Sequence, residues 1–139
     1  MLTVGGLFAL RAAAAADVPT AHELHTARCV AALEASSADL AVQVRAGHAE
    51  LEAPLLDRLK YGAAFIVDSY VQGERDERRA KGLLNAARQA QAALQRPELA
   101  TRQTACAQEG AQLLANANIV SRAVVSHLAG KRMKKLLEK

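Results

Sequence analysis

Hydrophobic positions recur every three or four residues along three stretches of this chain, which is the spacing of one face of an α-helix. The first stretch is predicted to begin after Thr20, because Glu23 lies three residues further on and completes a capping box. It ends at Gly47, a residue type that is common just past helix ends. The serine and aspartate residues at 36–39 could interrupt this helix, because their side chains compete for backbone hydrogen bonds. The inward positions are Val30, Leu33, Ser37, Leu40 and Val44.

The second stretch starts near Pro54, a residue that suits the first turn of a helix. It crosses a charged segment, GERDERR at residues 73–79, that contains no hydrophobic residue. The same register continues on both sides of this segment. That continuity favours one long helix, kinked between Gly73 and Arg79, over a reversal of the chain. The inward positions are Leu55, Leu59, Gly62, Ile66, Tyr70, Ala80, Leu84, Ala87, Gln91 and Leu94.

The third stretch starts at Pro97 and has the most regular pattern, with alternating steps of four and three residues. On its inner face, His127 is expected to be a core histidine. The three stretches predict an all-α fold, a bundle of three long helices. The alternative is a four-helix up-and-down bundle in which the middle stretch divides at residues 72–77. The inward positions of the third stretch are Leu99, Gln103, Cys106, Gly110, Leu113, Ala117, Val120, Val124 and His127.

Composition supports this fold class. The chain is rich in strong helix formers such as alanine and leucine, and it has only four aromatic residues and three prolines. Its 139 residues suit one compact unit. We therefore predict that residues 17–139 form a single helical domain, with a basic segment at its end, residues 131–139.

The chain has two cysteines, Cys29 and Cys106. Each lies about nine residues into its predicted helix, which places both roughly 13 Å from the helix starts. Two cysteines can be bridged only when their Cα atoms come close, and antiparallel neighbours would put these two at different levels. We therefore predict one disulfide, Cys29–Cys106, between helices that run parallel.

Residues 1–16 have the pattern of a signal peptide. An apolar run over residues 2–10 is followed by small residues at Ala14 and Ala16, which fit the A-x-A pattern for cleavage before Asp17. One arginine interrupts the pattern, and the alternatives are an apolar helix packed on the bundle or an organelle transit peptide. A signal peptide and an even number of cysteines together predict a periplasmic or secreted protein.

The net charge of +4 is concentrated at the C-terminal end. Residues 131–139 contain five lysines and arginines and one glutamate, whereas residues 17–127 are close to neutral. The sequence lacks the basic stripe and the aromatic residues of nucleic-acid-binding surfaces, so no nucleic-acid partner is predicted. A candidate contact for a partner protein or for an anionic membrane surface consists of Lys131, Arg132, Lys134 and Lys135.

His22, His25 and Cys29 lie on one face of the first predicted helix, at positions i, i+3 and i+7. Three such ligands could hold a transition metal. If Cys29 is bridged, however, only the histidine pair remains, which is a weak copper, nickel or zinc site. No other cofactor is predicted.

The sequence contains no glycine-rich nucleotide-binding motif, no C-x-x-C pair, no H-E-x-x-H motif and no nucleophile elbow. We therefore do not expect an enzyme. The predicted function is that of a small exported helical protein that acts by contact with an unidentified partner protein, as an inhibitor, a chaperone or an envelope adaptor. The alternative is a periplasmic metal-binding module that uses His22 and His25.

Overall fold

The computed structural model describes residues 18–139, in which five α-helices and one short 3-10 helix form and no strand is present. The predicted signal peptide lies outside these described residues. The all-α prediction is confirmed, and the prediction of three long helices is wrong. The helices are α2 (Ala21–Arg45), η1 (Ala49–Leu51), α3 (Glu52–Val71), α4 (Glu77–Ala92), α5 (Arg96–Asn116) and α6 (Ile119–Leu137).

Helix α2 begins and ends as its sequence predicts. The Thr20 hydroxyl accepts a hydrogen bond from the Glu23 backbone N–H, and the Glu23 carboxylate accepts one from the Thr20 backbone N–H, each at 3.0 Å. The serines do not break the helix, because the buried Ser37 hydroxyl donates to the Leu33 carbonyl of the same helix at 2.8 Å. Gly47 follows the helix with a φ of 111°, a conformation that glycine adopts without strain.

The middle stretch is two helices rather than one kinked helix. Gly73 has a φ of 98°, and the Glu74 backbone N–H donates to the Ser69 carbonyl at 3.0 Å, so the chain turns sharply away from α3. Asp76 then starts α4 by accepting a hydrogen bond from the Arg79 backbone N–H at 3.1 Å. The continuous register across residues 73–79 therefore did not indicate a continuous helix.

The last stretch also divides. Ala117 is extended, and the Asn118 side chain caps α6 by accepting a hydrogen bond from the Ser121 backbone N–H at 2.8 Å. The four-helix alternative is right that the middle stretch divides at residues 72–77, but its helix count is wrong because residues 96–137 form two helices. The new helix has a new register, in which Val125 and Ala129 are buried whereas Val124 and His127 are exposed.

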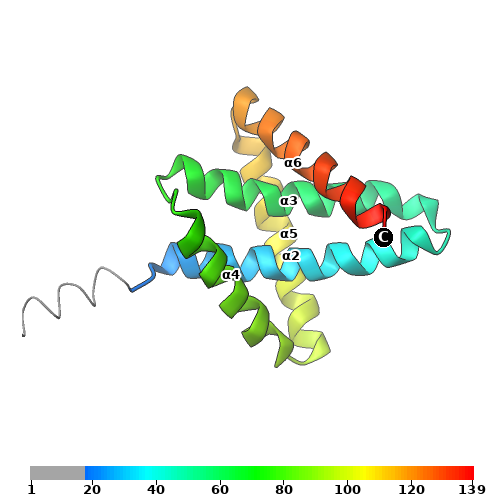
Figure 1. The fold of residues 1–139 in the computed structure, drawn as a ribbon, viewed down its shortest axis with the longest axis horizontal. Coiled ribbons are helices and arrows are strands. Elements are labelled where there is room, and N and C mark those ends of the chain that lie inside the picture. The colour runs from blue at the N-terminus through cyan, green and yellow to red at the C-terminus, as the bar shows by residue number, and fades with distance from the viewer. Residues whose placement is uncertain (1–17) are drawn as a thin grey trace, which may run out of the picture.

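Helices α2 and α3 form the centre of the fold, side by side and antiparallel (Figure 1). Helix α5 crosses behind both of them at a steep angle. Helices α4 and α6 lie on the opposite side, with α4 packed on α2 and α6 packed mainly on α3.

The disulfide joins α2 and α5 where they cross. It links Cys29 to Cys106, whose Cα atoms are 5.2 Å apart, and both residues are buried. The predicted bond is thus present in the structure, but the predicted parallel arrangement is wrong, since α5 crosses α2 steeply (Figure 1). Two helices that cross can bring one residue of each together at any angle. The equal depth of the two cysteines in their helices therefore carried no information about direction.

The helix interfaces bury three groups of apolar residues. The first surrounds the disulfide and includes Leu33 and Phe65. The second joins the ends of α2 and α6 to the start of α3, around Leu55 and Leu136. The third lies between α3 and α6, around Val125.

The basic segment 131–139 is mostly helical. Residues 131–137 are the last turns of α6, and the side chain of Leu136 is buried while its carbonyl accepts a hydrogen bond from the Arg45 guanidinium. Met133 and Leu137 pack partly against the same group of apolar residues, so they are turned toward the protein. In residues 18–139, no helix combines the length and the apolar character that crossing a membrane requires.

Helix α4 is attached to α2 largely through polar side chains. Arg79 pairs with Glu23 at 2.7 Å, and Arg88 pairs with Glu34 at 2.8 Å. Gln91 is the one residue of α4 that is buried, and its side-chain amide donates to the Ala31 carbonyl at 3.2 Å. The apolar contribution of α4 to the first core group is made by the partly buried Leu84.

Candidate functional site

A row of aliphatic side chains on α6 is exposed to solvent and becomes less exposed along the helix. The row consists of Val120, Val124 and Leu128, spaced by four residues, and it continues to Arg132. Exposure falls from 72% at Val120 to 43% at Val124 and 38% at Leu128. Each step of four residues rotates about 40° further than one full helical turn. The row therefore winds gradually around α6 toward α2 and α3.

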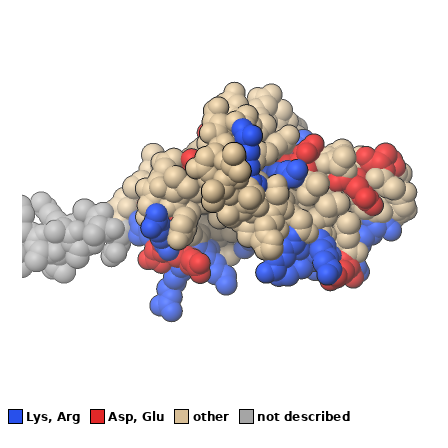
Figure 2. Space-filling model, turned by 90° about the horizontal axis from the view of Figure 1, so that it is seen from above, with Lys and Arg blue, Asp and Glu red and all other residues tan. Residues whose placement is uncertain are grey.

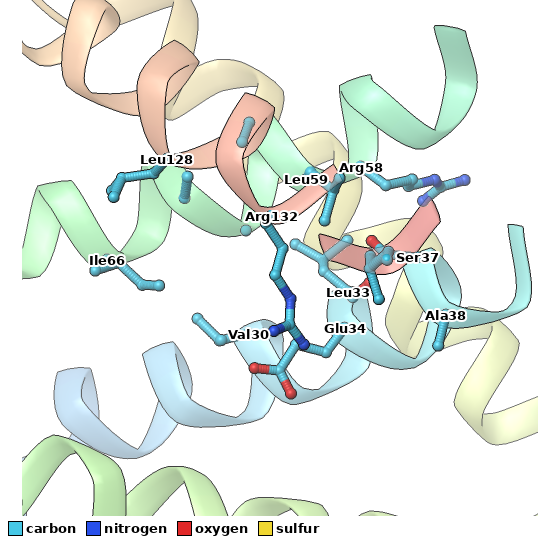
Figure 3. Close-up of a pocket in the computed structure, with 14 residues that line it drawn as sticks. Val30, Leu33, Glu34, Ser37, Ala38, Arg58, Leu59, Ile66, Leu128 and Arg132 are labelled. Carbon is cyan, nitrogen blue, oxygen red and sulfur yellow. The ribbon is translucent and has the colours of Figure 1, made fainter. Parts of the chain in front are cut away.

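The row leads to a pocket of about 290 Å³ between α2, α3 and α6. Figure 3 shows Ile66 of α3 and Leu128 of α6 facing each other at one side of this pocket, with Val30 and Leu33 of α2 at another. These are aliphatic side chains from three different helices. Together with the exposed Val120 and Val124, the pocket forms what we call the α3–α6 surface.

Charged side chains stand at the mouth of the pocket. Arg132 extends from α6 across the opening in the direction of Glu34 (Figure 3). Arg58 also lines the pocket, but its guanidinium points away from the opening and donates to the Gln103 carbonyl of α5 at 3.5 Å. The Glu34 carboxylate is paired with Arg88 of α4 at 2.8 Å. The mouth therefore combines one arginine, Arg132, with one carboxylate that already has a cationic partner.

The other predicted cations lie close to Arg132 in the sequence. Lys131, Arg132, Lys134 and Lys135 are all exposed on the last turns of α6. Figure 2 shows uncharged side chains across the middle of one face of the molecule, with groups of lysine and arginine side chains beside them. The α3–α6 surface thus has an aliphatic part, along the first half of α6, and a basic part along the second half.

The two predicted metal-ligating histidines have different partners. His22 donates to Glu74 at 2.8 Å and lies 3.6 Å from Asp68, at the end of α3. The hydrogen bond to Glu74, with a smaller contribution from Asp68, raises the pKa of His22 above its ordinary value. His25 instead contacts Glu109 of α5 at 2.5 Å. The structure brings each histidine to a carboxylate and does not bring the pair into one ligand group.

The ion pair between Glu23 and Arg79 fixes the start of α2 to the start of α4. Glu23 also accepts the capping hydrogen bond from Thr20. The Arg79 guanidinium and this backbone hydrogen bond lower the pKa of Glu23 to about 2. The charged form of Glu23 is therefore favoured by folding.

Glu23→Gln is expected to make the stability of the protein less dependent on pH at acid pH. The folded pKa of Glu23, about 2, is below its ordinary value of 4.5. Its stabilising contribution is thus present above the unfolded pKa and is lost as the pH falls from about 5 to 2. Urea unfolding at several pH values measures the difference between the wild type and this variant.

The matched control is Glu138→Gln, at an exposed residue just past the end of α6. We expect the wild type to be more stable than Glu23→Gln by about 1–2 kcal/mol at neutral pH, with the difference shrinking toward pH 2. If the difference in unfolding free energy between the wild type and Glu23→Gln stays constant between pH 5 and 2, the lowered pKa of Glu23 is contradicted.

The sequence pattern predicts the wrong face for several exposed apolar residues of α3 and α6. Ile66 and Tyr70 were predicted to point inward, yet they are 51% and 57% exposed, and Phe65 and Ser69 occupy the buried face instead. Val120 and Val124 were misassigned because the restart of the helix was missed. The N-cap sequence at Asn118 was the signal that could have located this restart.

Comparisons of the chain with protein-family models, with curated proteins and with solved structures found no match.

Proposed function

We propose that this protein acts, without chemistry of its own, by binding an amphipathic helix of a partner protein along the α3–α6 surface. The observation that carries the proposal is the row of exposed aliphatic side chains that leads into an apolar pocket. Contiguous exposed apolar surface costs solvation free energy, and in proteins it commonly marks a contact site. Laying the apolar face of a helix into such a groove is a recurring mode of recognition.

The size of the pocket supports a protein partner. At about 290 Å³ it is at the lower limit of cavities that hold small-molecule ligands. It suits one large side chain, such as leucine or phenylalanine, inserted between Ile66 and Leu128. A buried anchor of this kind typically contributes most of the free energy of a helix-mediated contact.

The charges at the pocket indicate which charge the partner carries. Arg132 stands at its mouth, and Lys131 and Lys135 continue the basic part of α6. A partner helix that follows the aliphatic row would reach these cations with one of its ends. We infer that this end carries aspartate or glutamate residues, which would also speed association.

The disulfide supports the proposal that the protein acts outside the cytoplasm. Disulfides persist in oxidising compartments and are rare in reducing ones, and Cys29 and Cys106 are bridged here. Export itself stays a prediction, since it depends on residues 1–16.

A labelled synthetic peptide tests the binding proposal. The probe is an amphipathic helix of about 16 residues with leucines on one face and glutamates near one end, and its partner probe has lysines in place of the glutamates. Fluorescence anisotropy is expected to show binding of the acidic peptide only. Val124→Asp and Arg132→Glu should each weaken this binding at least about tenfold, because one changes the aliphatic row and the other the mouth of the pocket.

Val42→Asp is the matched control, since Val42 is an exposed valine on α2 that does not line the pocket. It should leave peptide binding unchanged. Equal binding of both peptides, or an unchanged affinity in Val124→Asp, would count against the proposal. Sedimentation of the protein alone provides a further check: a dimer that Val124→Asp dissociates would show that a second copy occupies this surface instead. Binding to anionic vesicles that Arg132→Glu abolishes would point to a membrane.

A further inference from the structure

The disulfide has an unusual polar neighbourhood at one of its sulfur atoms. The Cys29 Sγ lies 3.8 Å from His25 Nε2 and 3.9 Å from Glu109 Oε2. These two side chains also contact each other, at 2.5 Å. Of the described residues, His25, Cys29 and Glu109 form the one group of three ligand-type side chains whose atoms all lie within 4.8 Å of one another.

Two helices hold this arrangement in place. His25 and Cys29 are one turn apart on α2, and Cys106 and Glu109 are one turn apart on α5. The crossing of α2 and α5 therefore brings two residues from each helix to the same place. The His25 ring packs edge-on against Phe65, with ring centroids 6.1 Å apart, which limits its orientation.

The spacing of the three atoms matches what a zinc ion requires. With ordinary bonds of about 2.3 Å to sulfur and 2.0–2.1 Å to nitrogen and oxygen, tetrahedral zinc places a sulfur about 3.6 Å from a nitrogen or oxygen ligand. The two distances from Cys29 Sγ are 3.8 Å and 3.9 Å. The His25–Glu109 contact would have to widen by about 0.8 Å, to roughly 3.3 Å. Side-chain rotation of partly exposed groups can supply this change.

We propose that reduction of the Cys29–Cys106 disulfide creates a zinc site in which His25, Cys29 and Glu109 are ligands. Cys106, freed beside them, is the nearest candidate for the fourth position. The exposed flank of the site gives zinc a route to it, because the His25 and Glu109 side chains are 50% and 44% exposed while the cysteines are buried. This inference is independent of the α3–α6 surface.

The chemistry requires a two-electron reductant, such as a dithiol. Two electrons and two protons from a dithiol convert the disulfide into two thiols, and the dithiol becomes a disulfide. Zinc then displaces the proton of the Cys29 thiol, which passes to solvent, and forms a bond to the thiolate. In the oxidised protein both sulfur atoms are held in the S–S bond and neither can act as a thiolate. The same crossing of α2 and α5 is thus closed by a disulfide under oxidising conditions and by a metal under reducing ones.

Cobalt(II) in place of zinc tests the proposal, because thiolate ligation of tetrahedral cobalt gives characteristic visible and charge-transfer absorption. The wild type, reduced with a non-chelating phosphine, is expected to show these bands with one cobalt per chain and to lose them when zinc is added. The oxidised protein should show none. Equal binding by both forms, or cobalt spectra without thiolate bands, would overturn the proposal.

Single substitutions distinguish the proposed metal ligands from residues that only lie near them. In the reduced protein, His25→Ala and Glu109→Gln should each weaken cobalt binding at least about tenfold, whereas His22→Ala should leave it unchanged because His22 contacts Glu74 and Asp68. Cys106→Ser should bind cobalt without a reductant, and Cys29→Ser should not. Circular dichroism checks that each variant is folded, and the histidine and glutamate variants keep the test valid if a serine variant unfolds. Unchanged affinity in His25→Ala and Glu109→Gln would refute the site.

Discussion

The double variant Cys29→Ala, Cys106→Ala is expected to be less stable than the oxidised wild type by about 4 kcal/mol. The bond joins residues separated by 77 positions in the sequence. In the chain-entropy account, a cross-link over this distance removes roughly 4.5 kcal/mol of conformational freedom from the unfolded chain. The apolar groups around Leu55 and Val125 contain no cysteine, and the group around Leu33 keeps its other members, so helicity should persist at room temperature.

Chemical unfolding followed by circular dichroism measures this loss. Reduction of the wild type in the presence of a metal chelator is the matched control, because it removes the bond without changing a residue. The loss of stability in the double variant and that in the reduced wild type should agree within about 1 kcal/mol. A loss below about 1 kcal/mol would mean that the unfolded chain is already compact or that the bond strains the native state.

Gly110→Ala is expected to destabilise the protein by about 2 kcal/mol, although alanine is the better helix former. Gly110 is where α5 packs against α3, and a Cβ atom there would lie 2.6 Å from the Cβ of Tyr61 and 2.9 Å from its carbonyl oxygen. These neighbours belong to the α3 backbone or are bonded directly to it, so no side-chain rotation relieves the clash. Overpacking of this kind costs up to about 3 kcal/mol, and the intrinsic preference for alanine offsets about 1 kcal/mol of it.

Gly82→Ala and Gly130→Ala are the matched controls. Both glycines lie inside helices, and a Cβ atom at either position meets nothing within 4 Å. Each replacement should therefore stabilise the protein by about 0.5–1 kcal/mol in thermal or urea unfolding. If all three variants gain stability, α3 and α5 can separate without cost and the close contact is not a constraint.

The sequence allowed the helical class and the start of α2 to be predicted, because each depends on local signals. The disulfide could be predicted because the chain has only two cysteines. The capping box at Thr20 is made by residues three positions apart, and it forms as expected. The breaks near Gly73 and Asn118 were missed for a physical reason. An inward-facing register can continue across a short turn by coincidence, whereas capping at Asp76 and Asn118 satisfies backbone groups directly.

The candidate sites depend on packing, which periodicity does not describe. The sequence grouped His22, His25 and Cys29 by their positions on one helix. The structure keeps His25 and Cys29 together and adds Glu109, which is 84 residues from His25 in the sequence. The angle at which α5 crosses α2 determines this meeting. The exposed row on α6 could not be predicted for the same reason, because the orientation of α6 is determined by its contacts with α3.

Because α4 is attached largely through polar side chains, we expect it to open before the rest of the molecule unfolds. The partly exposed Arg88–Glu34 ion pair contributes little stability, and Gln91 has a buried side-chain oxygen without a hydrogen-bond partner. Such an opening would cost much less free energy than global unfolding and would expose the amides of α4 to hydrogen exchange first. It would also release Glu34 from Arg88 at the mouth of the pocket, where Arg132 is the nearest cation in view (Figure 3). If a partner helix binds as proposed, motion of α4 would alter the charge that it meets, and local opening would then be linked to recognition.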